Sequence, residues 1–258
     1  RSEQQQVVIV LYNGVVFDCS DLSNNKLASL NTGVLEGLPK LKSLKLSHNL
    51  LAVIPTLPKN SNLTHLIIHH NRISEIQRNA VDRVLRLRTL DLSHNRIRHL
   101  RNDSFTQHPT LHQLYLNNNR LETMQVGCLD NVTALQWLRL SKNRLQQLPK
   151  NIFARLSQLK YLELNRNRLG VIDGLSFQGL SSLLTLKLRR NNIHTLMDGA
   201  FYGLGRLQNL HLDHNNITAV TKGWMYGLET LQQLLLSHNY ISKIEDDSWD
   251  SCRVLRHL

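Results

Sequence analysis

One unit recurs along almost the whole chain of 258 residues, and this repetition limits the folds that the chain can adopt. The pattern L-x-x-L-x-L-x-x-N-x-(L/I) begins nine times, with a first spacing of 22 residues between starts and seven further spacings of 24. The units start at Leu41, Leu63, Leu87, Leu111, Leu135, Leu159, Leu183, Leu207 and Leu231. A degenerate unit precedes them and an incomplete one follows, so one frame holds from Phe17 to Leu258. Units that repeat in fixed register predict a stack of equivalent coils.

The spacing and the residue types are those of leucine-rich repeats. In each unit the L-x-L segment predicts a short strand whose leucines point inward while their neighbours face solvent. A second block, such as Ala200, Phe201 and Leu204, fills the opposite side of each coil, where we expect short turns or 3₁₀ segments. We therefore predict an α/β, mostly β, solenoid: a leucine-rich repeat horseshoe with a parallel sheet on its concave side.

An asparagine column follows the strands in the same register. Where the chain leaves a strand it turns sharply, and an inward amide can satisfy backbone groups that neither water nor the sheet reaches. We therefore interpret the column as structural. Its members are Asn25, Asn49, Asn71, Asn95, Asn119, Asn143, Asn167, Asn191, Asn215 and Asn239.

The ends of the array differ from its middle. Apolar runs flank Asn13-Gly14, a strong signal for a two-residue hairpin turn, and predict a β-hairpin that caps the first coil. Residues 1–30 would form this cap and the degenerate first repeat, and residues 31–258 an array that continues to a truncated tenth unit, all in one continuous domain. Since no cap is recognisable near Leu258, we expect the natural protein to continue.

The charge of the chain favours acidic partners. Its formal net charge is +12, which suits sulfated glycans, nucleic acid, anionic lipid headgroups or an acidic protein. No recognised nucleic-acid-binding motif accompanies this charge, so we predict no nucleic-acid partner. No apolar run approaches the ~20 residues that cross a bilayer, so any membrane attachment would need a span outside this sequence.

Three cysteines occupy different places in the repeat frame. Cys128 and Cys252 fall where other units carry small or aliphatic core residues, so we expect both to be buried and too far apart to pair. Cys19 belongs to the N-terminal cap. It is either free or bonded to a cysteine upstream, as in extracellular caps.

Four N-x-S/T sequons favour an extracellular location, on the cell surface or secreted, although such triplets also arise by chance in an asparagine-rich repeat. None lies on an exposed strand position, so glycans would cover the flanks and the convex side and leave the concave face accessible. The predicted glycosylation sites are Asn62, Asn102, Asn131 and Asn216.

Large side chains cluster on neighbouring strands of the predicted sheet. Exposed aromatic residues and arginines are common anchors of protein interfaces, so this patch is the candidate partner-binding site. The alternative is a ladder of cross-strand contacts that stabilises the sheet without a ligand. The candidate residues are Tyr115, Trp137, Arg139, Tyr161, Glu163, Lys187 and Arg189.

A basic column stands just before each asparagine. It could bind sulfates or phosphates or respond to pH, or it could be a solvated repeat filler without a ligand. Its imidazoles do not supply a closed set of four zinc ligands, so we predict no metal and no cofactor. The column comprises His48, His70, His94, Asn118, Lys142, Arg166, Arg190, His214 and His238.

The sequence contains no pattern typical of an enzyme. Asp91, Ser93 and His94 lie close together, but the repeat frame accounts for them and no oxyanion hole is implied. There is no glycine-rich phosphate loop and no H-E-x-x-H motif. We predict a binding protein without catalytic residues.

Several stretches resemble the ectodomain of the LRIG family, the proteins with leucine-rich repeats and immunoglobulin-like domains. The resemblance is strongest between Leu138 and Leu255 and weaker before Leu111. The stretches are LRLSKNRLQQLP from Leu138, LNRNRLGVIDGLSFQGL from Leu164, RRNNIHTLMDGAFYGL from Arg189, TKGWMYGL from Thr221, and the spacing of Trp249, Cys252 and Leu255.

The resemblance implies a single-pass cell-surface protein that regulates growth-factor signalling. Its partners would be receptor tyrosine kinases of the epidermal-growth-factor receptor type or receptors for bone morphogenetic proteins. The sequence lacks the later repeats, the C-terminal cysteine cap and the immunoglobulin modules of that family. The alternative function is recognition of microbial glycolipids or glycosaminoglycans through Lys142, Arg166, Arg190 and the histidines of the basic column.

Overall fold

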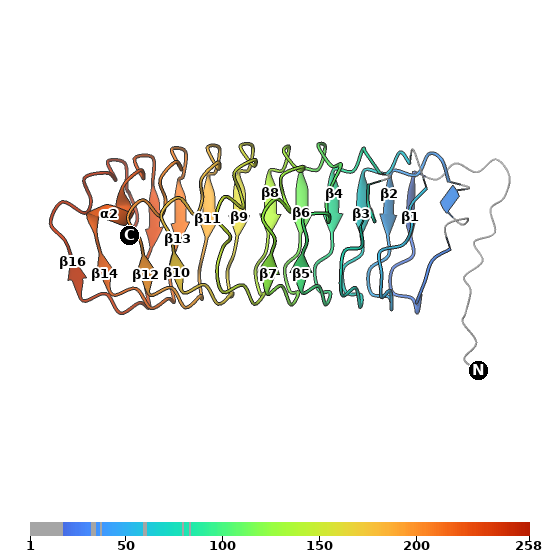
Figure 1. The fold of residues 1–258 in the computed structure, drawn as a ribbon, viewed down its shortest axis with the longest axis horizontal. Helices are drawn as coiled ribbons and strands as arrows, with labels where there is room; N and C mark the ends of the chain where they lie inside the picture. The colour runs from blue at the N-terminus through green and yellow to red at the C-terminus, as the bar shows by residue number, and fades with distance from the viewer. Residues whose placement is uncertain (1–17, 32–34, 37, 59–60, 79, 83) are drawn as a thin grey trace.

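The chain forms a right-to-left row of coils in the computed structural model, which describes residues 18–31, 35–36, 38–58, 61–78, 80–82 and 84–258 (Figure 1). Each coil contributes one strand to a ten-stranded parallel sheet, with order β1-β2-β3-β4-β6-β8-β9-β11-β13-β15. The strands are β1 (Cys19–Asp21), β2 (Ser43–Lys45), β3 (His65–Ile67), β4 (Thr89–Asp91), β6 (Gln113–Tyr115), β8 (Trp137–Arg139), β9 (Tyr161–Glu163), β11 (Thr185–Lys187), β13 (Asn209–His211) and β15 (Gln233–Leu235).

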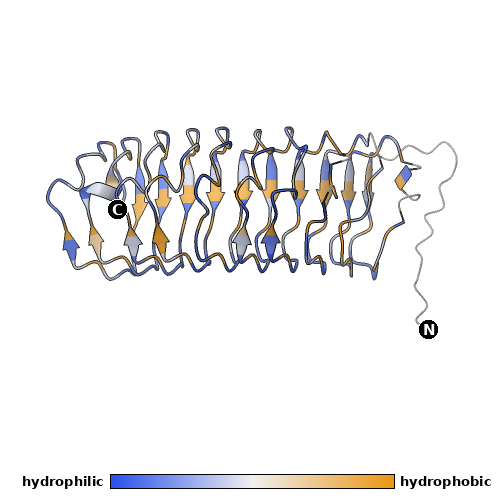
Figure 2. Ribbon diagram, viewed as in Figure 1, coloured by the Kyte–Doolittle hydropathy of each residue, from blue (hydrophilic) through white to orange (hydrophobic). Residues whose placement is uncertain are grey.

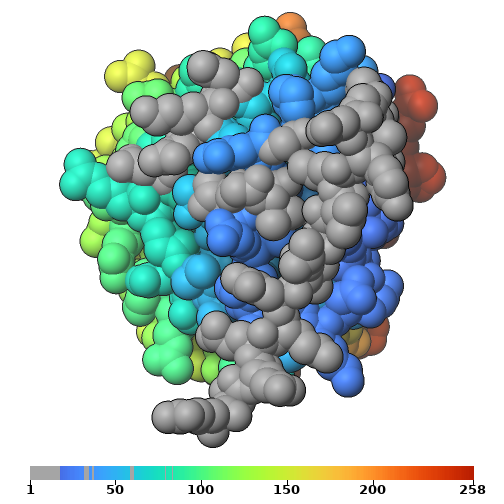
Figure 3. Space-filling model, turned by 90° about the vertical axis from the view of Figure 1, so that its right-hand side faces the viewer, coloured from blue at the N-terminus to red at the C-terminus, as the bar shows by residue number. Residues whose placement is uncertain are grey.

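From β2 to β15, each three-residue strand of the main sheet buries its central leucine, and its flanking residues are exposed or half-buried except for the buried Thr89. In β8, for example, Leu138 is fully buried while Trp137 and Arg139 are exposed. Apolar residues recur at the same level in successive strands (Figure 2). Viewed from the N-terminal end, the later coils lie behind the first (Figure 3). The predicted leucine-rich repeat solenoid is confirmed.

A second, interrupted layer of two-residue strands lies below the main sheet in Figure 1 and was not predicted. It comprises three parallel pairs, β5 (His99–Leu100) with β7 (Thr123–Met124), β10 (Val171–Ile172) with β12 (Thr195–Leu196), and β14 (Ala219–Val220) with β16 (Lys243–Ile244). Turns fill much of the rest of each coil, as expected. None of the described helices is long and apolar enough to cross a bilayer.

The turn-rich side has a core of stacked aromatic rings. The ring centroids of Phe153 and Phe177 are 6.1 Å apart and those of Phe177 and Phe201 5.9 Å, with 8° between the ring planes in each pair. The next coil differs because Trp224 stands where earlier coils carry Ala200 or Ser176, and there the chain forms the short helix α2 (Lys222–Met225). The aromatic column thus ties this side of neighbouring coils together, as the leucines do beneath the sheet.

The asparagine column links each coil to the one before it. From Asn49 to Asn239, the side-chain oxygen accepts a hydrogen bond of 2.9–3.2 Å from a backbone N–H of the preceding coil. The Nδ2 group donates to a carbonyl of the preceding coil at 2.9–3.1 Å. It also donates within its own coil, as Asn143 does to the Leu140 carbonyl at 2.9 Å. The predicted structural role is confirmed.

The residue before each of these asparagines has a left-handed backbone. Along the basic column φ lies between 54° and 57°, from His48 to His238. Asparagine and histidine tolerate this conformation better than most residues do. Backbone geometry therefore gives one reason for the frequent His and Asn in this column, independent of any ligand.

The cysteines occupy the places that the repeat frame predicts. Cys128 is fully buried and Cys252 nearly so, and burial raises the pKa of Cys128 to about 12 and that of Cys252 to about 11. Both thiols are therefore protonated and unreactive at neutral pH. Cys19 is exposed at the start of β1 and forms no disulfide with Cys128 or Cys252. The predicted hairpin cap falls on residues 1–17, outside the described residues.

A buried histidine interrupts the aliphatic lining of one coil. His108 occupies the position that Leu156, Leu180 and Leu204 fill in other coils, and it is fully buried. Its Nε2 lies 3.2 Å from Asp82 Oδ1, and Thr106 donates a hydrogen bond to the other oxygen of Asp82. Burial lowers the pKa of His108, although the Asp82 carboxylate opposes this shift. The folded state thus binds the proton of His108 less readily than the unfolded state does.

We expect replacement of Asn143 by Ala to lower the free energy of unfolding by ~1–3 kcal/mol. The substitution leaves buried backbone groups of Leu116, Leu121 and Leu140 without these hydrogen-bond partners. The matched control is Asn25→Ala. Asn25 is exposed, and among the described residues its side chain bonds only to carbonyls of its own coil, so its loss should change stability by less than about 0.5 kcal/mol. Urea denaturation followed by circular dichroism measures both, and equal effects at the two positions would contradict the inter-coil role.

We expect His108 to make stability fall in mild acid. The contribution of a neutral buried histidine is complete above the unfolded-state pKa of about 6.5 and is lost as the pH falls below it, at up to ~1.4 kcal/mol per pH unit. His108→Leu should remove this part of the pH dependence. Unfolding of both proteins in urea between pH 7.5 and 5.5 measures the difference, and parallel pH profiles would show that His108 is not responsible.

Candidate binding surface

The predicted patch lies on the outer face of four adjacent strands, β6, β8, β9 and β11. The register places Gln113, Trp137 and Tyr161 side by side in one row. A second row contains Tyr115, Arg139, Glu163 and Lys187. The structure therefore brings together the residues that the sequence assigned to one surface.

Trp137 and Tyr161 form the apolar centre of the patch. Their ring centroids are 5.1 Å apart with 31° between the ring planes. Trp137 remains 37% exposed, although it lies between neighbouring strands on both sides. The indole thus offers a large apolar surface to a partner while its neighbours restrict its motion, which reduces the entropy lost on binding.

Arg139 lies between two tyrosine rings. Its guanidinium carbon is 5.3 Å from the centroid of the Tyr115 ring and 5.7 Å from that of Tyr161, within the range of cation–π contacts. Its Nε is 3.6 Å from Glu163 Oε2, which also accepts a hydrogen bond of 3.3 Å from the Tyr161 hydroxyl. Lys187 Nζ lies 5.2 Å from the Tyr161 ring centroid. Two cations, one anion and the aromatic rings therefore orient one another.

Tyr115 is half-buried beside this arginine. Burial raises the pKa of its phenol, an effect that Arg139 opposes and Asp91 reinforces. The hydroxyl is therefore protonated at neutral pH, and it donates to Gln113 Oε1 at 3.2 Å. Tyr115 thus presents a fixed neutral edge to the patch.

Arg189 lies at the margin of the patch, two residues beyond the end of β11. Its Nε is 2.6 Å from Asp213 Oδ2 in the next coil, and its backbone N–H donates to Asn165 Oδ1 at 2.8 Å. Asn165 in turn donates to Glu163 Oε1 at 3.2 Å. Asp213 was not among the predicted residues of the patch, although the repeat frame places it one coil beyond Arg189 in the same column.

The sequons lie outside the strands of the main sheet. Asn102, Asn131 and Asn216 are exposed, whereas Asn62 is partly buried. Asn62 Nδ2, the atom that a glycan would modify, donates to the Pro39 carbonyl at 2.9 Å. The face that carries the patch is thus free of all four positions, whether or not they are modified.

Part of the basic column forms a continuous edge beside the patch. Lys142, Arg166 and Arg190 are exposed on adjacent coils and line a shallow hollow of about 120 Å³. Histidines occupy the column toward both ends, with His48 and His70 stacked at 4.2 Å and His214 and His238 at 4.1 Å between ring centroids. The column is therefore cationic in its middle and aromatic at its ends.

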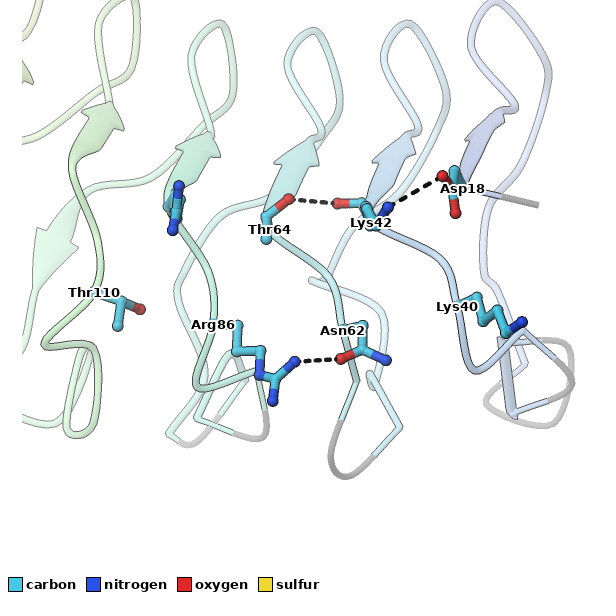
Figure 4. Close-up of a pocket in the computed structure, with 8 residues that line it drawn as sticks. Asp18, Lys40, Lys42, Asn62, Thr64, Arg86 and Thr110 are labelled. Carbon is cyan, nitrogen blue, oxygen red and sulfur yellow. Dashed lines mark hydrogen bonds and ion pairs between the residues drawn. The ribbon is translucent and has the colours of Figure 1, made fainter. Parts of the chain in front are cut away.

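A second basic surface lies where the chain enters strands β1 to β6, and it was not predicted. It is a hollow of about 550 Å³. Figure 4 shows Lys42 Nζ directed at Asp18, at 3.1 Å, and Arg86 bound to Asn62 Oδ1 at 2.7 Å. The lining residues are Asp18, Lys40, Lys42, Asn62, Thr64, Arg86, Arg88 and Thr110.

Comparison with known proteins finds relatives over a limited part of the chain. Human leucine-rich repeats and immunoglobulin-like domains proteins 3 and 1 are 45% and 42% identical to it over 73 residues, which is 28% of this chain and 6% and 7% of theirs. Osteomodulin of Bos taurus is 39% identical over 74 residues, 17% of its length. The matched segment thus spans less than a fifth of each of these relatives.

Solved structures match the fold over nearly the whole chain. A chain in the octameric complex of Latrophilin 3, Unc5D and FLRT2 (LRR) is 25% identical with a TM-score of 0.81, over 96% of this chain and 76% of that one. A chain of the Drosophila Toll–Spatzle complex is 21% identical with a TM-score of 0.71, over 90% of this chain and 35% of that one. The second likeness concerns the fold alone.

The family model for the leucine rich repeat matches residues 21–56, 61–121, 109–169, 157–217 and 205–258. These ranges cover most of the sequence, and the structure over them is a parallel solenoid. The chain belongs to the leucine-rich repeat family.

Proposed function

We propose that the chain is the extracellular protein-binding module of a cell-surface regulator of growth-factor receptor signalling, and that it is not an enzyme. The partner would dock on the concave face of the solenoid, the outer face of the ten-stranded sheet, at Tyr115, Trp137, Arg139, Tyr161, Glu163, Lys187 and Arg189. The observation that carries the proposal is the exposed Trp137 packed on Tyr161 beside an arginine held between two tyrosine rings.

The contacts within the patch favour recognition as well as stability. A cross-strand ladder that only stabilises the sheet would gain most by burying its aromatic groups, yet Trp137 stays exposed and Arg139 is also exposed. Aromatic residues and arginine are the side chains enriched at the energetic centres of protein interfaces. Because their neighbours already hold them, a partner would gain contact area with little ordering of this face.

The similarity to other proteins supports an extracellular receptor-like role. The relatives include the two human leucine-rich repeats and immunoglobulin-like domains proteins and leucine-rich repeat-containing G-protein coupled receptor 5 of Rattus norvegicus. The sequence stretches that resemble the LRIG ectodomain direct the choice of partner. We propose a receptor tyrosine kinase of the epidermal-growth-factor receptor type or a receptor for bone morphogenetic proteins.

We expect the double variant Trp137→Ala, Tyr161→Ala to bind such a receptor ectodomain about tenfold or more weakly than the unmodified chain, because it removes the central apolar contacts. Surface plasmon resonance with the chain immobilised and purified receptor ectodomains in solution measures the affinity. Near-ultraviolet circular dichroism and the urea midpoint confirm that the variant is folded.

The matched control is the double variant Tyr202→Ala, Tyr226→Ala. These two rings are also exposed and stacked, at 5.7 Å and 3°, but they lie in the turn-rich half of the coils. The control should bind as the unmodified chain does. Equal affinity for all three folded proteins would exclude the patch as the contact, and absence of binding to every receptor ectodomain would contradict the proposed partner class.

The second candidate function is recognition of a sulfated glycan or microbial glycolipid by the basic column. The observation in its favour is the run of Lys142, Arg166 and Arg190 on adjacent coils, whose left-handed backbones project the three side chains from one edge. The repeat distance of about 4.8 Å between coils is short enough for one polyanion to contact all three cations. Such binding would be dominated by charge.

We expect this second function to show strong salt dependence. Heparin binding should weaken steeply between 50 and 150 mM salt, since exposed charges are screened. It should also weaken in the triple variant K142N, R166N, R190N, whose asparagines suit the left-handed backbone. The charge-matched control K150N, R155N, R206N removes three exposed cations from the turn-rich half. Indifference to salt, or equal losses in both triple variants, would contradict specific binding by the column.

A further inference from the structure

Four histidines gather at one edge of the main sheet, just after strands β2, β3 and β4. His48, His70 and His94 belong to the basic column, and their rings stack with centroid distances of 4.2 Å and 3.9 Å and interplanar angles of 14° and 13°. His69 precedes His70 at a position where most other coils carry Ser or Asn. His69 lies outside the predicted basic column, which contains only the residues next to the asparagines.

His69 changes the chemistry of this cluster. Its Nδ1 lies 2.8 Å from His70 Nδ1, and its ring centroid is 5.0 Å from that of His70 and 5.3 Å from that of His48. A neutral imidazole has one N–H donor and one lone pair, so a single proton bridges the two Nδ1 atoms. A metal ion can replace this proton and bond to the lone pairs of both nitrogens.

The distances suit a mononuclear site after small side-chain movements. One ring nitrogen each from His48, His69 and His70 lies within 4.8 Å of the others. Zinc bonds to histidine nitrogen are about 2.0–2.1 Å long, which places tetrahedral ligands about 3.3 Å apart. His48 and His70 are exposed and His69 is partly buried, so the first two rings can rotate without disturbing the core.

We propose that His48, His69 and His70 form a binding site for one divalent transition-metal ion, with Zn²⁺ as the representative ion and water at the remaining position. Imidazole ligands suit zinc, copper and nickel, whereas magnesium and calcium prefer oxygen ligands. Three protein ligands with one open position also leave the metal accessible to a ligand from a partner. This inference does not depend on the proposed function.

The chain contains its own comparison site at the other end of the column. His214 and His238 stack in the same way, at 4.1 Å and 13°. His69 precedes His70, the later member of its stacked pair, whereas the residue before His238 is Ser237. Asp213 precedes His214, the earlier member, and its Oδ2 lies 2.6 Å from Arg189 Nε. The two ends thus share a stacked pair, but no third histidine precedes either member of the second pair.

Isothermal titration of the untagged chain with ZnCl₂ at pH 7.4 tests the proposal. We expect one ion to bind, and the variants H69S and H70N each to weaken binding by about tenfold or more. Serine occurs at the position of His69 in several coils, and asparagine suits the left-handed backbone at His70. The control H214N, H238N should bind zinc as the unmodified chain does, and MgCl₂ should give no binding.

The proposal fails if the unmodified chain binds no zinc below millimolar concentrations, or if H69S, folded as judged by circular dichroism, binds as tightly as the unmodified chain. It also fails if H214N, H238N loses the binding while H69S retains it. A second variant, H48N, guards against a structural effect at His69, since His48 is exposed and should also weaken binding about tenfold or more.

Discussion

Each coil is fastened to the preceding one by an asparagine whose amide reaches across the junction. The oxygen accepts from one backbone N–H of the earlier coil and the nitrogen donates to one of its carbonyls, so the chain can leave each strand in a tight turn without stranding buried polar groups. In this turn the residue before each asparagine has a left-handed backbone. The same bonds recur once per coil, in step with the parallel register of the main sheet.

A regular scaffold of this kind makes a surface whose pattern is set by side chains alone. Neighbouring strands repeat at about 4.8 Å, so residues one unit apart in sequence become neighbours across the sheet. The patch around Trp137 uses that spacing, with rings and charges from consecutive coils in contact. Because stacking of the coils already supplies the rigidity, a binding partner need not order this face, and affinity can reside in a few anchors.

Much of this architecture could be predicted from the sequence, because the repeat frame assigns every residue to a column. It predicted the strands, the inward leucines, the role of the asparagines and the buried Cys128 and Cys252. It also assigned Trp137, Arg139 and Tyr161 to one face, and the structure adds the cation–π and ring contacts that depend on side-chain conformation. Their function as a binding site stays a prediction.

Other features could not be read from a column. The two-residue strands of the second layer depend on how neighbouring backbones approach each other, and no residue pattern in the sequence predicts them. The contact between His69 and His70 depends on the rotamers of adjacent side chains. His108 is different, since a histidine in a column of leucines could have been noticed, but its pairing with Asp82 in the preceding coil requires coordinates.

The central claim is that the outer face of the main sheet, at Trp137, meets a receptor on the cell surface. Placing a photoreactive benzoylphenylalanine at position 137, or at the exposed control position Tyr202, and irradiating living cells that carry the receptor tests it most directly. The account predicts that mass spectrometry finds peptides of the receptor ectodomain joined to position 137 and not to position 202. Crosslinks from position 202 alone, or equal yields from both, would contradict it.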